Sequence, residues 1–389
     1  MIRRAKISST VLALMLTSTL IAGLAGCQTT SPTPTATSAP TATTTVVPTP
    51  TMAMTPTTNS SAASGTRSVT DMLGRKLTVP MNVNRVLTLS PVEMELVYML
   101  APDKLAGLSF AWNGDLVPDK YKNIPVIGGW FGTQTGNYEV FIGQKPDVIL
   151  GGLVAPENAT DIEDKQQKFG AIPVIGLQSW TKVADYGDTI RFVGDLLGAQ
   201  DQAASLLTYY NEAMQYVNSA VSEIPDSAKV KVYYAEGKDG FSTDPAGSQH
   251  TQLIDFCGGK NVADVALKAG YGMADTSLEQ ILKWDPDMII IGRGSQAGLY
   301  KTIMSDPRWN QVRAVKNKQV FLRPDNPVSW FDGPPGPAQI LGMYWTVNKL
   351  YPDRTKDLDL QSKVKEFYSK FFHYDLTDEQ VSQLLANPG

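Results

Sequence analysis

Histidine and cysteine are scarce in this chain of 389 residues, which has two of each. First-row metal sites are built from histidine, cysteine or clustered carboxylates. With only His250 and His373 available, a histidine-rich site for a bare metal ion is excluded, and acid–base catalysis by histidine is not expected. Cys257 lies in an apolar stretch and is predicted to be a small core residue. The other cysteine, Cys27, lies in the N-terminal segment, so no disulfide is expected within the folded part.

The chain also lacks the features of nucleic-acid-binding proteins and of several enzyme classes. Its 34 basic and 38 acidic side chains give a net charge of -4 without a basic block, so nucleic acid is not an expected partner. There is no Gly-x-Ser-x-Gly elbow, no His-Glu-x-x-His and no phosphate-binding glycine-rich loop with lysine. The segment Ile291–Ser295 contains Gly-x-Gly without the third glycine of a dinucleotide site. The sequence therefore predicts that the protein is not an enzyme.

The N-terminal apolar run, Val11–Leu24, is too short and too often interrupted by Ser and Thr to span a bilayer, which takes about 20 apolar residues. It follows a positive stretch formed by Arg3, Arg4 and Lys6, and it ends in small residues. This order is typical of a signal peptide, which we predict over residues 1–26.

The end of this run, Leu24-Ala25-Gly26-Cys27, resembles the lipobox of bacterial lipoproteins. The resemblance implies cleavage before Cys27 and a diacylglycerol on its thiol. Two or three lipid chains hold a protein durably at a membrane. A plain signal peptide with a chance cysteine is the alternative.

A segment rich in Thr, Pro, Ser and Ala follows Cys27 as far as residue 67. It has too little apolar surface to offset the entropy of ordering, and its prolines favour an extended spacer. We therefore predict a lipidated cysteine and tether over residues 27–67. The remaining residues, 68–389, exceed what a single hydrophobic core usually holds, so two lobes are expected.

Short apolar runs alternate with helical patterns through the rest of the chain. A hairpin is predicted around Gly74, and strands are predicted at residues 85–89, 105–108, 147–150, 172–175, 230–234, 288–291 and 319–322. Strands that alternate with helices predict an α/β fold with mainly parallel sheets. The tail is predicted to be helical, with a capping box at Thr377–Gln380.

The longest helical pattern predicts a rigid connector between the lobes. Its apolar side chains recur every three or four residues and form one stripe: Ala203, Leu207, Tyr210, Met214, Val217 and Val221. The helix is predicted from residue 201 to 224, ending at Pro225, with a length of ~36 Å. The predicted organisation is an N-terminal α/β lobe over 68–198, a connecting helix within 199–225, and a C-terminal α/β lobe with a helical tail over 226–389.

The two predicted lobes share one element. Glu139 is followed after six residues by Pro146-Asp147, and Glu279 is followed at the same spacing by Pro286-Asp287. Each copy is typical of a short helix with an acid at its start, a turn and a buried strand. A first-turn acid that complements the helix dipole, at about 0.3–1 kcal/mol, would explain either glutamate alone. That alternative does not require the two copies to share their spacing.

In their order along the chain, these elements resemble a known family. The resemblance rests on Asp71-Met72-Leu73-Gly74-Arg75 with Val79-Pro80, Arg85 to Pro91 with Glu95, Lys145-Pro146-Asp147, and Gly258 to Val262. They resemble the class III solute-binding proteins of ABC importers, which serve ferric siderophores, haem and cobalamin. The resemblance implies two α/β lobes joined by one rigid helix, with the ligand held between them. It also implies that Glu139 and Glu279 dock onto arginines of the two permease subunits.

The same resemblance sets the expected partners and location. The expected protein partner is an ABC permease dimer with its ATPase subunits, and the expected ligand is a small-molecule metal chelate. The protein itself is expected to be a monomer without a permanently bound cofactor. A ferric siderophore is the favoured ligand, with haem or cobalamin as alternatives. The protein is expected to be exported and lipid-anchored, facing the extracytoplasmic side. A lipid-anchored envelope enzyme and an adhesin are the alternatives of another class.

Aromatic residues gather after the predicted strands, where parallel α/β sheets bind ligands. The candidate ligand-binding residues are Trp112, Trp130, Phe131, Phe241, Tyr271, Arg293, Trp330 and Phe331. Neighbouring glycines and prolines place Trp130-Phe131 and Trp330-Phe331 on exposed loops, as apolar walls for a bulky ligand. The planar donors of Arg293 suit an anionic ligand. Core packing for the aromatics and a surface position for Arg293 are the alternatives.

An oxyanion is the second candidate ligand, because some members of the family bind molybdate or tungstate. The loop Gly132–Asn137, which leads into the predicted Glu139 helix, suits an oxyanion held by backbone N–H groups and hydroxyls. An ordinary polar loop is the alternative. His250, at the start of a predicted helix, could cap the ligand cleft or ligate the metal of a chelate.

Overall fold

The computed structural model describes residues 65–152, 159–178, 182–267, 273–292 and 296–387. These residues belong to one compact unit, Ser60–Gly389. The predicted signal peptide, Cys27 and the tether up to residue 64 lie outside the described residues, as do Tyr271 and Arg293. Among the described helices, none has both the length and the apolar character needed to cross a membrane.

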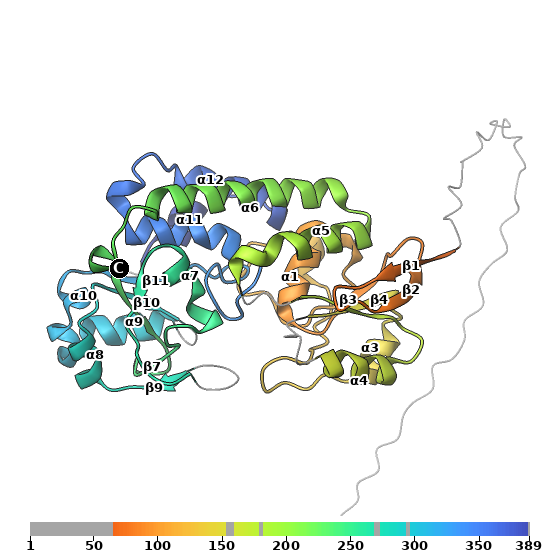
Figure 1. Cartoon of the computed structure of the whole chain (residues 1–389), viewed down its shortest axis with the longest axis horizontal. Helices are drawn as coiled ribbons and strands as arrows, with labels where there is room; N and C mark the ends of the chain where they lie inside the picture. Colours follow the sequence, from red (N-terminus) through yellow and green to blue (C-terminus); the bar gives the residue numbers. More distant parts are fainter. Residues whose placement is uncertain (1–64, 153–158, 179–181, 268–272, 293–295, 388–389) are drawn as a thin grey trace, which may run out of the picture. The chain divides into compact units, whose positions relative to one another are not determined.

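The first half of the described chain, residues 65–198, is built on a three-stranded parallel sheet (Figure 1). Its strands, in sheet order, are β3 (Val86–Thr88), β4 (Val148–Gly151) and β5 (Val174–Gly176). Every strand residue is buried, as expected for a parallel sheet covered on both faces. The helices of this half are α1 (Pro91–Leu100), α2 (Asp119–Lys122), α3 (Tyr138–Gly143), α4 (Ala159–Phe169) and α5 (Tyr186–Leu197).

One predicted strand of this half is not formed. Residues 105–108 make only isolated bridges, at Leu105 and Leu108. The reason is that their amides pair with different segments: Ala106 N donates to Val86 O, whereas Leu108 N donates to Pro125 O.

The second half, residues 226–387, contains a separate four-stranded parallel sheet. Its strands, in sheet order, are β11 (Val320–Leu322), β10 (Met288–Ile291), β6 (Lys231–Ala235) and β8 (Lys260–Asn261), and a small antiparallel pair, β7 (Ser242–Thr243) and β9 (Ala274–Asp275), lies beside it. The helices are α7 (Gln252–Phe256), α8 (Leu278–Trp284), α9 (Gln296–Ser305), α10 (Arg313–Lys316), α11 (Gln339–Leu350), α12 (Leu360–Phe367) and α13 (Asp378–Leu385). Two separate parallel sheets with helices between their strands confirm the predicted α/β fold class.

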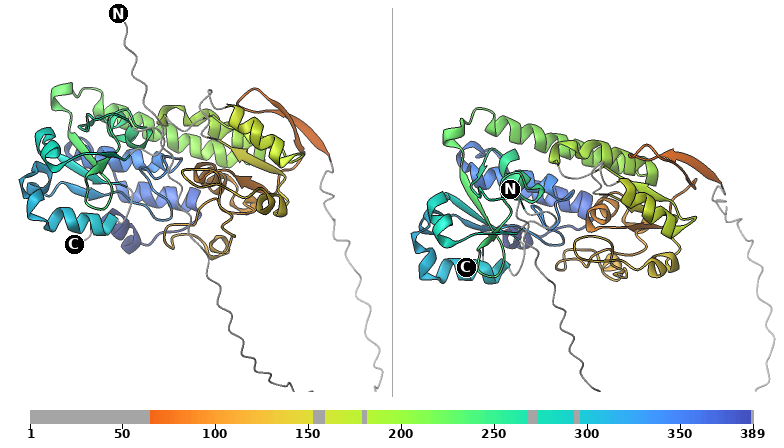
Figure 2. Two further views of the ribbon diagram at one scale, coloured as in Figure 1. Left: turned by 90° about the horizontal axis from the view of Figure 1, so that it is seen from below. Right: turned by 60° about the horizontal axis from the view of Figure 1, so that its bottom comes forward.

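The predicted long helix is present as α6 (Gln200–Val221). It packs against α5 of the first half and against α11 of the second, and Figures 1 and 2 show it running beside both. A single hydrophobic core contains buried side chains of α1, α6 and α11, among them Leu96, Leu206 and Tyr344. The connector is therefore one helix of a packed layer rather than an isolated rod.

The C-terminal tail contacts the first half of the chain. After α12 the chain continues through a π-helical turn, Tyr368–Phe372, that packs back onto α1 of the first half. Tyr98 of α1 donates its hydroxyl to Phe372 O at 2.6 Å, and His373 Nε2 lies 2.9 Å from Tyr98 O. The predicted organisation places this tail with the second lobe, and its contacts with α1 could not be predicted because contacts between segments so far apart leave no trace in a local pattern.

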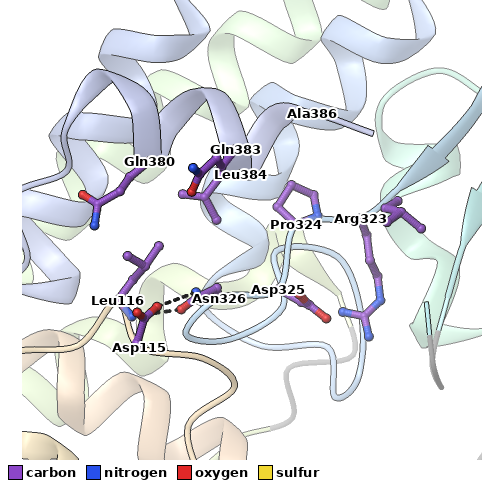
Figure 3. Close-up of a pocket in the computed structure, with 11 residues that line it drawn as sticks. Asp115, Leu116, Arg323, Pro324, Asp325, Asn326, Gln380, Gln383, Leu384 and Ala386 are labelled. Carbon is purple, nitrogen blue, oxygen red and sulfur yellow. Dashed lines mark hydrogen bonds between the residues drawn. The ribbon is translucent and has the colours of Figure 1, made fainter. Parts of the chain in front are cut away.

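A clasp formed by Asn113, Asp115, Leu116, Asn326 and Pro327 also joins the halves. Leu116 N donates to Asn326 Oδ1 at 3.1 Å, and Asn113 N donates to Pro327 O at 2.9 Å. Asn326 Nδ2 reaches Asp115 Oδ1 at 3.4 Å, and Figure 3 shows these side chains facing each other below α13. A cavity of about 320 Å³ borders the clasp. Hydrogen bonds thus fix the two halves to each other at a second place, away from α6.

The N-terminal hairpin explains one of the family-like segments. Strands β1 (Thr66–Thr70) and β2 (Lys76–Pro80) pair antiparallel, and Gly74 in their turn has φ +81. The buried carboxylate of Asp71 accepts hydrogen bonds from Arg75 Nη2 at 2.6 Å and from Gly176 N at 2.9 Å. Asp71 therefore attaches the hairpin to the end of β5, which is a structural role.

Candidate functional site

A buried polar cluster lies at the carboxyl ends of the second sheet. Tyr234 is near the end of β6, and Asp332 follows β11 in the loop that leads to α11. Asp244 and His250 come from the segment between β7 and α7. All four are buried, and one ligand-type atom from each of Asp244, His250 and Asp332 lies within 4.8 Å of the others. Ligands of parallel α/β sheets bind at this edge, so the cluster is the candidate site in this half.

Hydrogen bonds hold the cluster in one arrangement. His250 Nδ1 lies 2.5 Å from Asp332 Oδ1, and Asp332 Oδ2 accepts the hydroxyl of Tyr234 at 3.0 Å. Ser248 Oγ donates to Asp244 Oδ1 at 3.0 Å and accepts from His250 N at 3.2 Å. Ser248 thereby caps the short 3-10 helix Gln249–Thr251 that carries the histidine. The imidazole is oriented from its ring nitrogen and from its backbone.

The chemistry of these donors suits a metal or its complex. Histidine and carboxylate oxygens are ligands for first-row transition metals. A carboxylate that binds one ring nitrogen fixes the orientation of a histidine whose other nitrogen is a ligand. The His250 side chain keeps 8% of its surface exposed, and Nε2 has no hydrogen-bond partner among the described residues.

Arg323, which the sequence analysis missed, lies beside this cluster. It directly follows β11, is 6% exposed, and donates from Nη1 to Ser329 Oγ. Ser329 Oγ also accepts from Asp332 N at 3.1 Å. Ser329 is therefore a hydrogen-bond partner of both the Arg323 guanidinium and the backbone of Asp332. Within the described ranges, Arg323 Nε is buried without a hydrogen-bond partner. Its place directly after a predicted strand, as for Arg293, was the signal that could have found it.

The carboxyl ends of the first sheet carry two buried glutamates of α1. Ser90 begins α1 with a capping box, and its Oγ donates to Glu93 Oε2 at 2.5 Å. Glu93 Oε1 has no hydrogen-bond partner in the described part of the chain, and a Cβ on Gly152 would lie 2.2 Å from it. Burial raises the pKa of Glu93 to about 7 and raises the pKa of Glu95 well above its usual value. Burial therefore favours the protonated, uncharged form of both carboxyls.

Only part of the predicted aromatic wall is accessible. Phe110 is 45% exposed, and its ring meets that of Phe131 edge-on at 6.1 Å. Trp130, expected in the same exposed loop, is partly buried and packs against the core of the first half, with its ring 5.0 Å from the ring of Phe141. Trp112 likewise packs at 4.6 Å against Tyr98. The glycines near Trp130 shape a turn over the core instead of projecting the ring into solvent.

The expectation that Trp330 and Phe331 form an exposed loop is wrong. Both side chains are fully buried, and Phe331 stacks on Tyr234 at 5.3 Å. A Cβ on Gly342 of α11 would lie 1.7 Å from Trp330 O, so this helix packs directly on the loop. Burial of these large aromatic side chains under α11 is favourable in free energy. This gain outweighed the tendency of the nearby glycines and prolines to form an exposed loop.

Phe241 is half-buried at the edge of the second half. Its ring stacks at 5.4 Å, nearly parallel, on Trp309, and the Arg308 guanidinium lies 5.7 Å from its centre. The Phe241 ring is therefore in contact with two other side chains of the protein. Tyr271 and Arg293, the remaining candidates, lie outside the described residues.

The repeated glutamates occupy equivalent places. Glu139 is the second residue of α3 and Glu279 the second residue of α8, and both are exposed. The Pro-Asp turns that follow are equivalent too. Asp147 Oδ2 accepts from Arg85 N at 2.9 Å at the start of β3, and Asp287 Oδ2 accepts from Lys231 N at 2.9 Å at the start of β6. The sequence repeat therefore corresponds to a repeat in three dimensions.

The loop Gly132–Asn137 leads into α3, and its last residue, Asn137, caps that helix. The side chain of Asn137 accepts hydrogen bonds from Glu139 N at 2.9 Å and from Val140 N at 3.3 Å. It therefore uses the amides that an anion would need, and α3 has only six residues. At the start of α3, two of the amides available to an oxyanion are therefore already paired.

Known proteins resemble this chain over most of its length. The model of the family described as periplasmic binding protein matches residues 86–327. The molybdate-binding protein MolA of Haemophilus influenzae is 26% identical over 340 residues, covering 80% of this chain and 93% of that protein. The Fe(3+)-citrate-binding protein YfmC of Bacillus subtilis is 26% identical over 189 residues, covering 48% of this chain and 56% of that protein.

Solved structures show the same fold. An ABC transporter solute binding protein from Sulfurospirillum deleyianum superposes with a TM-score of 0.75 at 27% identity, covering 82% of this chain and 98% of that one. MolA of Haemophilus influenzae bound to molybdate superposes with a TM-score of 0.64 at 23% identity, covering 80% of this chain and 99% of that one.

Proposed function

Because the chain belongs to the periplasmic binding protein family, we propose that it is the substrate-binding receptor of an ABC import system. In this role the mature protein is anchored through a lipid on Cys27 and faces the extracytoplasmic side. The two halves act as lobes that hold one small molecule between the carboxyl ends of their sheets. It works as a monomer, without catalysis and without a permanently bound cofactor.

The observation that carries this proposal is the matched pair of exposed acids, Glu139 on α3 and Glu279 on α8. Each lies at the second position of a short helix, and the aspartate of the Pro-Asp turn that follows binds the backbone at the start of a neighbouring strand, β3 or β6. Two equivalent charges on twin halves suit a partner built from two similar subunits, and such charges set orientation and register more than affinity. The permease dimer, carrying its ATPase subunits, is that partner.

We propose a metal chelate as the ligand, with ferric siderophores ahead of haem and cobalamin. Two features support this choice. The second half brings His250 to the site with buried Asp244 and Asp332, a donor set that favours a metal centre. The first half offers the Phe110–Phe131 pair, with Phe110 45% exposed, as apolar surface for an organic chelator. Relatives whose names give Fe(3+)-citrate, iron(3+)-hydroxamate or vitamin B12 agree with it.

Molybdate or tungstate is the second candidate. The specific observation in its favour is Arg323, whose buried guanidinium is a planar donor for an oxyanion. The extensive match to the molybdate-binding protein MolA supports the same alternative.

A ligand panel tests the proposal. The purified protein is titrated by calorimetry and by thermal unfolding with ferric citrate, a ferric hydroxamate, haem, cobalamin, molybdate and tungstate, and with sulfate and phosphate as controls. A ligand at 100 times its Kd should stabilise the fold by about 2.7 kcal/mol. Stabilisation by a chelate supports the first candidate, and stabilisation by molybdate or tungstate alone supports the second. If no compound of either class binds, the receptor function is refuted.

A further inference from the structure

His250 is held in a way that leaves one ring nitrogen available. Its Nδ1 is engaged by Asp332 at 2.5 Å, and Asp332 is in turn engaged by Tyr234 at 3.0 Å. Asp332 is 0% exposed, whereas the imidazole keeps 8% of its side-chain surface accessible. The described residues offer no hydrogen-bond partner to Nε2.

This arrangement differs from that of an ordinary core histidine. Buried polar atoms are normally hydrogen-bonded, and burying a carboxylate is costly unless it is paired. The other histidine of the chain, His373, is different, because its Nε2 is paired with the backbone oxygen of Tyr98. At His250 the free nitrogen instead lies at the carboxyl edge of a parallel sheet, where ligands bind.

We propose that His250 is a direct metal ligand of the receptor: its Nε2 coordinates the metal centre of the bound chelate. The inference rests on the proposed function. The proton stays on Nδ1, shared with Asp332, and the Nε2 lone pair replaces a water molecule on the metal. The bond that forms is nitrogen to metal, the bond that breaks is water to metal, and no electron is transferred. Imidazole suits iron, copper and nickel, and a carboxylate on the other ring nitrogen is the usual support of such a ligand.

A consequence is selectivity for chelates that leave a coordination position open. A chelator that fills every position of the metal offers His250 nothing to bind. Asp332 acts as a positioning residue, because it orients the ring without reaching the metal. Replacement of such a supporting carboxylate typically costs about 10–100-fold in metal affinity.

The test uses the purified full-length protein with copper(II)–iminodiacetate, a chelate that keeps positions open for nitrogen donors. Electron paramagnetic resonance of the wild type labelled with [15N]histidine should show coupling to one 15N nucleus. The signal should persist in His373→Gln, the matched control, and disappear in His250→Gln. Wild-type spectra without histidine coupling, or coupling that disappears in His373→Gln instead, would overturn the inference. The wild-type spectrum with the control decides the matter even if His250→Gln fails to fold.

Affinities separate this inference from the proposed function. We expect His250→Gln to weaken ferric citrate binding about tenfold or more and Asp332→Asn to weaken it about 10–100-fold. Neither should change binding of a hexadentate ferric hydroxamate as strongly. If ferric citrate binds the wild type and His250→Gln equally, the inference fails while the receptor function stands. If no chelate binds the wild type, the chelate function itself fails.

Discussion

Replacing the buried Glu93 with glutamine should make the protein more stable above neutral pH. Burial raises the pKa of this carboxyl from 4.5 to about 7 in the folded protein. The folded state therefore binds the proton more tightly than the unfolded chain does. The contribution of Glu93 to stability is fully present below pH 4.5 and is lost as the pH rises through 7. The gap between the two pKa values corresponds to about 3 kcal/mol, which the wild type loses once Glu93 is charged.

In the wild type, Ser90 N donates to the Glu93 carboxylate at 3.1 Å. The Glu93→Gln variant keeps an oxygen acceptor for this N–H group and cannot ionise. Urea unfolding at pH 5 and pH 8 should show that the variant exceeds the wild type by up to about 3 kcal/mol at pH 8 and by much less at pH 5. Glu95 titrates in both proteins, so the difference between them reports Glu93 together with its electrostatic effect on Glu95.

The exposed Glu223 provides the control, since Glu223→Gln should follow the wild type at both pH values. A Glu93→Gln variant that parallels the wild type from pH 5 to pH 8 would contradict the assignment of Glu93 as a buried, nearly neutral acid. A variant less stable at pH 8 would show that the charged form is stabilised in the fold.

Two further predictions test the proposed docking of the two halves to the permease and the clasp that joins the halves. Glu139→Gln and Glu279→Gln should each lower uptake of the ligand by cells several-fold while leaving its Kd unchanged, and normal uptake by the double variant would refute the docking role. Gly114 has φ +88 and leaves no room for a Cβ, which would lie 2.4 Å from Asn326, so Gly114→Ala should lose about 2–5 kcal/mol in urea unfolding. Gly74 has φ +81 but open space around it, so Gly74→Ala should lose only about 1–2 kcal/mol, and equal losses would refute the clasp.

Local patterns predicted most of the secondary structure correctly. Period and spacing predicted α6, the strands of both sheets except β8, and the capping box at Thr377 that begins α13. These features depend on neighbours within a few residues, such as the match of apolar side chains to 3.6 residues per turn. The equivalent turns at Asp147 and Asp287 were visible for the same reason.

The candidate site was less accessible to sequence reasoning. Aromatic side chains follow several predicted strands, yet Trp330 is fully buried and Trp130 packs, partly buried, against a core cluster. Arg323 was not noticed, although its neighbourhood resembles that of Arg293. A flanking glycine or proline determines which conformations the backbone can adopt. It does not say which face of a ring the next helix will cover.

The sequence by itself determined the α/β class, the two matching halves and the long helix, because each follows from short-range periodicity and from a repeat. Only the tertiary structure decided that His250 meets Asp332, 82 residues further along the chain, and that the tail after α12 packs onto α1. Those contacts depend on how separate elements pack, and packing energy depends on the shapes of surfaces that no local pattern encodes.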